Sequence, residues 1–174
     1  MHATSSKLVL IAADIRSTHN VGSFFRTSDG LGVERLYLCG ITPYPKQANT
    51  DSRLPYIADR AHSQIHKTAL GAEETQPWEY VQSASEIIKK LQYEGWRVCA
   101  LEQSPSSVNL ADYQPAAKTA LVVGNEVDGL PAELLRICDD TLEIAMIGQK
   151  ESFNVSVAAA IGLYWLKQQS PTRQ

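Results

Sequence analysis

The N-terminal part of the sequence has little apolar character of the kind that export or membrane anchoring requires. Its N-terminal apolar run, Leu8 to Ala13, is too short for the core of a signal peptide or for a membrane span. Its three cysteines, Cys39, Cys99 and Cys138, are far apart and form no CxxC pair. This spacing indicates neither a disulfide framework nor a zinc ribbon, and we expect reduced thiols. We therefore expect a cytoplasmic protein with no membrane partner.

Several motifs of nucleotide-binding and hydrolytic enzymes are also missing. No GxGxxG follows the first apolar run, and neither GxxxxGK[ST] nor GxSxG occurs. A Rossmann site, a P-loop and a nucleophile elbow are therefore not expected. His62 and His66 are four residues apart and could share a helix face, but they lack the intervening Glu of a zinc protease and an evident third ligand. The sequence predicts a surface or RNA-facing pair here, and no metal.

The overall charge gives no support to nucleic-acid binding. Lys and Arg total 16 against 19 Asp and Glu, which gives a net charge of −3. Binding to nucleic acid would then need a local basic surface. The best candidate is the irregular middle segment, residues 41–77, which contains Arg53, Arg60 and Lys67. A solvated loop explains the same composition about equally well.

The chain does have alternating strand-like and helix-like segments. Its 174 residues, 44% hydrophobic and 20% charged, fit one globular domain, residues 1–174. The alternation predicts an α/β fold with a mainly parallel sheet flanked by helices on both faces. The predicted strands are residues 8–13, 34–39, 96–101, 117–123 and 142–146. The predicted helices are residues 20–31 (with Asn20 as the cap), 81–93, 131–138 and the segment from 155 onward, which ends in a frayed tail, 168–174.

Three segments, at residues 15–32, 121–131 and 143–166, each contain a polar loop that follows a predicted strand. The carboxyl ends of parallel strands meet at one edge of a sheet, where α/β proteins hold ligands. Each segment also has a plainer explanation. Arg26 could form a structural salt bridge or lie on the surface, instead of binding a phosphate. The 121–131 segment could be an ordinary strand-to-helix connection.

Taken together, these segments resemble three motifs of one enzyme family. NVGSFFRTSDGLGV (20–33), VVGNEVDGLP (122–131) and IAMIGQKESFNVSVAAAIGLY (144–164) resemble the SpoU/TrmH family of RNA 2′-O-ribose methyltransferases, within the SPOUT superfamily. KTALGAE (67–73), followed by PWEY (77–80), looks like one branch of that family. The resemblance covers nearly the whole chain. It implies an α/β fold with a deep C-terminal trefoil knot, a homodimer, and methyl transfer from S-adenosylmethionine to a ribose 2′-hydroxyl of tRNA or rRNA.

The resemblance also implies roles for particular residues. Arg26 is the family's candidate base, but a guanidinium stays protonated, so holding a phosphate and stabilising an alkoxide is an equally physical role. Glu126 or a phosphate oxygen would then accept the proton. The residues implied in catalysis are Arg26, Asn20, Glu126 and Asn154. Those implied in cofactor binding are Leu101, Gly124, Asn125, Ile144, Met146, Ser152 and Phe153. For RNA binding we expect Arg16, Arg53, Arg60 and Lys67.

Two positions depart from the family pattern. Ala145 stands where Pro is common and Phe153 where Leu is usual. Both lie in the implied cofactor loop, so an RNA-binding or assembly protein without transfer activity stays open as an alternative. Residues 47–65 look inserted, and we expect them to influence the choice of RNA. For the dimer, we expect the shallow face formed by Ala159 and Gly162 on the last helix to pack against its symmetry mate.

Overall fold

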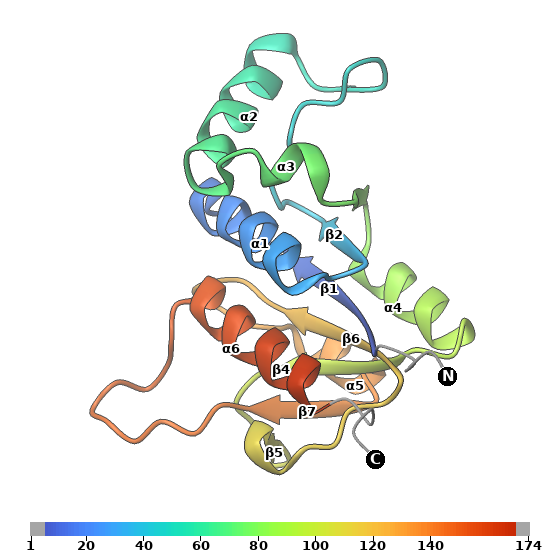
Figure 1. Ribbon diagram of the computed structural model, residues 1–174, viewed down its shortest axis with the longest axis vertical. Coiled ribbons are helices and arrows are strands. Elements are labelled where there is room, and N and C mark those ends of the chain that lie inside the picture. Colours follow the sequence, from blue (N-terminus) through green and yellow to red (C-terminus); the bar gives the residue numbers. More distant parts are fainter. Residues whose placement is uncertain (1–5, 170–174) are drawn as a thin grey trace.

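The computed structural model describes residues 6–169, which fold around a seven-stranded sheet (Figure 1). All six strand pairs are parallel, as the alternating pattern predicted. The order across the sheet is β3-β2-β1-β6-β4-β7-β5. The strands are β1 (Lys7–Ala13), β2 (Arg35–Cys39), β3 (Trp78–Val81), β4 (Arg97–Leu101), β5 (Val108–Asn109), β6 (Lys118–Val123) and β7 (Asp140–Glu143).

Helices cover both faces of the sheet (Figure 1). Alternate residues of β1 point to opposite faces: Leu8 and Leu10 join one apolar cluster with α1 and α6, while Val9 and Ile11 join another with α4 and α5. Burial on both faces explains why the strands read as continuous apolar runs. The helices are α1 (Thr18–Leu31), α2 (Pro55–Ala69), α3 (Ala72–Thr75), α4 (Ala84–Tyr93), α5 (Ala132–Ile137) and α6 (Val155–Gln168), with a 3₁₀ turn at Leu110–Asp112.

The strand order creates a crevice at the carboxyl edge of the sheet. From β1 the chain builds outward through β2 and β3, then crosses to the other side, and β6 returns to lie between β1 and β4. At such a reversal the connections leave the sheet in opposite directions, so the loops there leave room for a ligand. The three polar segments predicted from the sequence all leave strands at this edge.

Several predicted boundaries are wrong, and two of them matter for function. The helix α1 begins at Thr18, because the Ser17 side chain accepts the Asn20 amide hydrogen at 3.3 Å. Asn20 is therefore inside the first turn and is not the cap. Its side chain is then free to form hydrogen bonds outside the helix. The strand β7 ends at Glu143, because its pairing with β4 ends at Leu142 and its pairing with β5 ends at Glu143. Residues from 144 onward therefore form a loop.

The middle segment is more regular than predicted. It contains α2, whose first turn holds Pro55. A proline that interrupts a periodic pattern also suits the start of a helix, because N–H groups in the first turn have no acceptor within the helix and the N–H that proline lacks is not needed there. Residues 78–81 form β3, so the helix predicted from residue 81 begins only at Ala84.

The packing of α6 contradicts the predicted dimer face. Ala159 and Gly162 are buried against the chain's own sheet, where a Cβ on Gly162 would lie 2.9 Å from Leu121 Cδ2. The small residues allow the helix axis to approach the strands, so they are not free to meet another copy. The exposed apolar side chains of α6 are instead Val157 and Tyr164, which are 46% and 56% exposed.

The cysteines are unpaired, as predicted. Burial raises the pKa of both the Cys39 and the Cys99 thiol to about 12, which makes them unreactive. Within residues 6–169 no helix is long and apolar enough to cross a bilayer. The predicted tail belongs to α6 as far as Gln168, and its part from Ser170 lies outside the described residues. The cytoplasmic location, the single domain over residues 1–174 and the trefoil knot stay predictions.

Candidate active site

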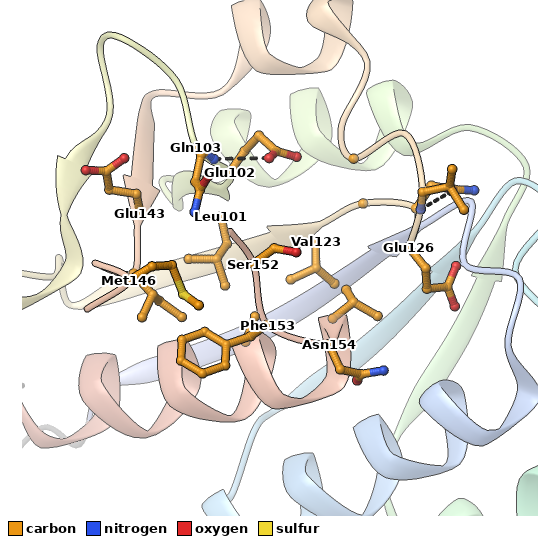
Figure 2. A pocket seen from close by; sticks show the side chains of 17 residues that line it. Leu101, Glu102, Gln103, Val123, Glu126, Glu143, Met146, Ser152, Phe153 and Asn154 are labelled. Carbon is orange, nitrogen blue, oxygen red and sulfur yellow. Dashed lines mark hydrogen bonds between the residues drawn. The ribbon is translucent and has the colours of Figure 1, made fainter. Parts of the chain in front are cut away.

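A pocket of about 410 Å³ lies where β4, β6 and β7 end (Figure 2). Its walls come from three segments: the end of β4, the loop after β6, and the loop between β7 and α6. The volume falls within the ~300–1,000 Å³ that small-molecule sites occupy. Every residue that the resemblance assigned to cofactor binding lines this pocket: Leu101, Gly124, Asn125, Ile144, Met146, Ser152 and Phe153.

The centre of the pocket is apolar. Figure 2 shows Leu101, Val123, Met146 and Phe153 gathered there, while glutamates and Gln103 lie around them. Phe153, one of the two departures from the family pattern, is 43% exposed and lines the pocket. Ala145, the other departure, is exposed and does not line it. Only the change at position 153 therefore reshapes the pocket directly.

The loop after β6 is a tight turn that only glycine permits at two positions. Asn125 and Gly129 exchange backbone hydrogen bonds of 3.2 and 3.0 Å. Gly129 has a φ of +67°, and a Cβ on Gly124 would lie 2.5 Å from the Gly129 carbonyl carbon. The Asn125 side chain fastens the turn to β1 by donating to the Asp14 carbonyl at 2.9 Å. The turn presents its backbone to the pocket in one conformation.

A chain of hydrogen bonds joins the three motifs beside the pocket. Glu126 accepts the amides of Arg16 and Ser17, each at 3.0 Å, and the Asn20 side-chain amide at 2.8 Å. The Asn20 oxygen in turn accepts from Asn154 Nδ2 at 3.3 Å. Asn154 also caps α6. The predicted catalytic residues Asn20, Glu126 and Asn154 are thus in one network.

The electrostatics of Glu126 favour a structural task over proton transfer. Burial alone would raise the pKa of Glu126, but the hydrogen bonds from the Arg16 amide and the Asn20 side chain outweigh it and lower this pKa. A carboxylate stabilised as the anion by three donors is a weak general base. Its negative charge lies at the N-terminus of α1, where it is favourable.

Arg26 is not part of this pocket. It lies on an exposed part of α1 and forms no hydrogen bond or ion pair with any residue between 6 and 169. The salt bridge suggested as its plainer explanation is therefore absent from the described part of the chain. Arg16 is near the pocket and pairs with Asp128 at 3.3 Å. Arg60 and Lys67 are exposed on α2.

Arg53 has a different environment from the one predicted. Its guanidinium pairs with Asp51 at 2.6 and 2.8 Å, donates to the Tyr44 carbonyl at 2.9 Å and stacks 3.6 Å from the centre of the Tyr44 ring. The hydrogen bond from Arg53 lowers the pKa of Asp51 far below its usual range. Because its donors are engaged inside the chain, Arg53 closes the loop before α2 and is poorly placed to bind RNA.

The two histidines of α2 face acidic residues of α3. His66 contacts the Glu73 carboxylate, and His62 lies 3.7 Å from Glu74. Burial would raise the pKa of Glu73, but the hydrogen bond with His66 outweighs it and lowers this pKa. The pairs tie α2 to α3, and the predicted absence of a metal stays a prediction. The ligand atoms of His62, Glu73 and Glu74 do lie within 4.8 Å of one another, a grouping that spacing along the sequence did not reveal.

The sequence reasoning missed two pocket glutamates, Glu102 and Glu143. Glu102 accepts the Leu130 amide at 2.9 Å, and Glu143 accepts from Ser107 Oγ at 2.6 Å. Each follows or ends a strand at the ligand edge, next to a residue that was predicted. That position was the signal that could have identified them.

Comparison with known proteins agrees with this geometry. The SpoU rRNA Methylase family profile matches residues 7–164. The tRNA (guanosine(18)-2′-O)-methyltransferase of Aquifex aeolicus is 28% identical over 165 residues, which are 93% of this chain and 69% of that protein. The 23S rRNA (guanosine-2′-O-)-methyltransferase RlmB of Neisseria meningitidis is 32% identical over 160 residues, 90% of this chain and 56% of that protein.

A solved structure shows the same fold. The SpoU methyltransferase AviRb from Streptomyces viridochromogenes, in complex with the cofactor AdoMet, aligns with a TM-score of 0.76 at 24% identity, over 95% of this chain and 58% of that one. The chain thus spans little more than half of AviRb and of RlmB. The matched region includes all three motifs and every element that builds the pocket, and we conclude that the chain belongs to the SpoU rRNA methylase family.

Proposed function

We propose that this protein transfers a methyl group from S-adenosylmethionine to the 2′-hydroxyl of a ribose in RNA. The observation that carries the proposal is the convergence of all three family motifs on one pocket and its flanking network. Two relatives named as guanosine 2′-O-methyltransferases, one for tRNA and one for 23S rRNA, support the same reaction. The tRNA and the rRNA substrates remain alternatives for this chain.

The pocket suits a cationic donor better than a phosphorylated nucleotide. Its lining contains three glutamates and no Lys, Arg or His, so it would repel phosphate groups and attract a sulfonium. The apolar centre fits an adenine ring, and the turn at Gly124 and Gly129 brings backbone groups close to a ligand. When bound, S-adenosylmethionine supplies the electrophilic methyl group.

The chain's own residues would position the acceptor and stabilise its charge. Hydrogen bonds among Asn20, Glu126 and Asn154 fix the three segments relative to one another. Positioning of the reacting groups accounts for much of the rate in an in-line displacement. Arg26, exposed and unpaired within the described residues, would hold a backbone phosphate and stabilise the developing alkoxide. The lowered pKa of Glu126 favours water or a phosphate oxygen as the proton acceptor.

Cofactor binding and transfer can be tested separately. The wild-type protein should bind S-adenosylmethionine in calorimetry and gain about 2.7 kcal/mol of stability at a ligand concentration a hundred times the dissociation constant. It should also place labelled methyl groups on tRNA or rRNA as 2′-O-methylnucleosides. Because Arg26 does not line the pocket, Arg26→Ala should bind the cofactor normally yet lose transfer by about 100-fold.

Two results would count against the proposal. A protein that binds no S-adenosylmethionine cannot be the enzyme we propose. A protein that binds the cofactor, yet methylates neither total tRNA nor rRNA, would support the alternative of an RNA-binding or assembly protein. The observation behind this alternative is Phe153, which lines the pocket at a position where the family usually has Leu.

We propose that Arg16, Arg60 and Lys67 contact RNA, and that Arg53 does not. Reversing the charge of Arg60 and Lys67 together should weaken RNA binding and reduce the slope of log affinity against log salt by about 2, since each phosphate contact contributes nearly one unit. The matched control reverses Lys89 and Lys90, which are exposed on α4 over the opposite face of the sheet. An equal loss of RNA affinity in both double variants would show that Arg60 and Lys67 of α2 do not contact RNA.

A homodimer is also proposed, through the exposed apolar face of α6 at Val157 and Tyr164. These side chains lie beside the partly buried Ile161 and give the helix an apolar stripe that no residue between 6 and 169 covers. Sedimentation velocity should show a dimer for the wild type and a monomer for Tyr164→Lys. A wild-type monomer at micromolar concentration would contradict the proposal.

A further inference from the structure

We infer that Glu102, Glu126 and Glu143 make the pocket selective for the charge of its ligand, favouring the cationic methyl donor over its neutral product. This inference rests on the proposed function. Figure 2 shows the three glutamates spaced around the apolar side chains of Leu101 and Val123. They come from three different segments of the chain, which the fold brings to one cavity.

Among the residues that the structure describes, the three carboxylates accept hydrogen bonds only from uncharged donors. Glu102 accepts the amides of Gln103 and Leu130 at 3.0 and 2.9 Å. Glu143 accepts the Ser107 hydroxyl, and Glu126 accepts two backbone amides and a side-chain amide. Within residues 6–169 no Lys, Arg or His forms an ion pair with any of them.

Arg16, a cationic residue near the pocket, already has an acidic partner. The Arg16 guanidinium pairs with Asp128, which itself does not line the pocket. No cationic side chain within residues 6–169 therefore neutralises the charge of the three glutamates. Low-dielectric walls around charges of one sign concentrate their field in a cleft. The field therefore acts on whatever occupies the pocket.

The charge of the occupant changes during the proposed reaction. The ribose oxygen forms a bond to the methyl carbon while the carbon–sulfur bond breaks, and its electron pair stays on sulfur. The hydroxyl proton leaves to water or phosphate. The sulfonium thereby becomes a neutral thioether, so the attraction of the glutamates acts on the donor and is lost on the product. The pocket would hold the donor and release the product.

Glu143 offers the cleanest test. Glu143→Gln removes one negative charge but keeps an oxygen that can accept from Ser107 Oγ. Glu133→Gln is the matched control, because Glu133 is exposed on α5 and does not line the pocket. The ligands are S-adenosylmethionine, sinefungin (in which a protonated amine replaces the sulfonium) and the neutral S-adenosylhomocysteine.

Calorimetric dissociation constants for the three ligands decide the inference. Glu143→Gln should weaken both cationic ligands by about threefold to tenfold, the size of one charge interaction in a partly solvated pocket, and should change the neutral ligand less than about twofold. The effect should shrink at high salt, and Glu133→Gln should change none of the three constants. An equal loss for all three ligands, or no loss for the cations, would overturn the inference. Failure of the wild type to bind any of them would instead count against the proposed function.

Discussion

Gly124→Ala should weaken the binding of S-adenosylmethionine by roughly a hundredfold. A Cβ at this position would lie 2.5 Å from the Gly129 carbonyl carbon and 2.6 Å from both the Gly129 oxygen and the Leu130 nitrogen. These are backbone atoms of a turn already closed by two hydrogen bonds, so no side chain can rotate away. Displacing packed atoms in this way costs about 1–3 kcal/mol, and each 1.4 kcal/mol is a factor of ten in affinity.

The matched control for this variant is Gly148→Ala. Gly148 lies in the loop between β7 and α6, and a Cβ there would meet nothing within 4 Å. Calorimetry should give this control the wild-type dissociation constant, with both variants still folded by circular dichroism. Wild-type affinity in Gly124→Ala would show that the turn after β6 does not shape the cofactor site.

Gly22→Ala should destabilise the protein by about 3 kcal/mol or more, the upper end of what overpacking costs. The helix α1 crosses α2 at Gly22, where a Cβ would lie 2.1 Å from Thr68 Oγ1 and 2.3 Å from the Ile65 carbonyl oxygen. The threonine could rotate, but the carbonyl belongs to the backbone of α2. Relief therefore requires the two helices to separate, which would expose the buried side chain of Ile65.

Gly30→Ala provides the control in the same helix. A Cβ on Gly30 would meet nothing within 4 Å, and alanine favours a helix by about 0.5–1 kcal/mol over glycine. Thermal and denaturant unfolding should therefore show opposite changes in the two variants. A melting temperature for Gly22→Ala equal to that of Gly30→Ala would mean that α1 and α2 are not packed as closely as described.

Much of the architecture could be predicted because it follows from local pattern. Apolar runs such as Leu8 to Ala13 are buried on both faces of the sheet, and burial of that kind requires helices on both sides. The family motifs correctly indicated residues that line the pocket, because each motif contains or adjoins the carboxyl end of a strand at the same edge of the sheet. Boundaries were less certain: Ser17 took the capping role predicted for Asn20, because its hydroxyl accepts the amide hydrogen of Asn20.

The errors concern faces and partners. Ala159 and Gly162 were expected to meet a second copy, but they pack on β6 and β4. Arg53 was expected to bind RNA; the structure shows its donors engaged with Asp51 and Tyr44, and its lack of contact with RNA is our proposal. In each case the sequence shows whether a side chain is small or charged, but it does not show which residues that side chain contacts in the folded protein.

The sequence by itself determined the α/β class, the membership in an RNA methylase family and the segments that make the pocket. Short-range regularities carry this information, because strands, helix caps and motifs are formed by neighbours in the chain. Only the tertiary structure decided which groups touch. Asn20 meets Glu126 across 106 residues and Asn154 across 134, and Glu102 lines the same cavity as Glu126 and Asn154. Contacts at such separations depend on strand order and helix packing, which no local pattern specifies.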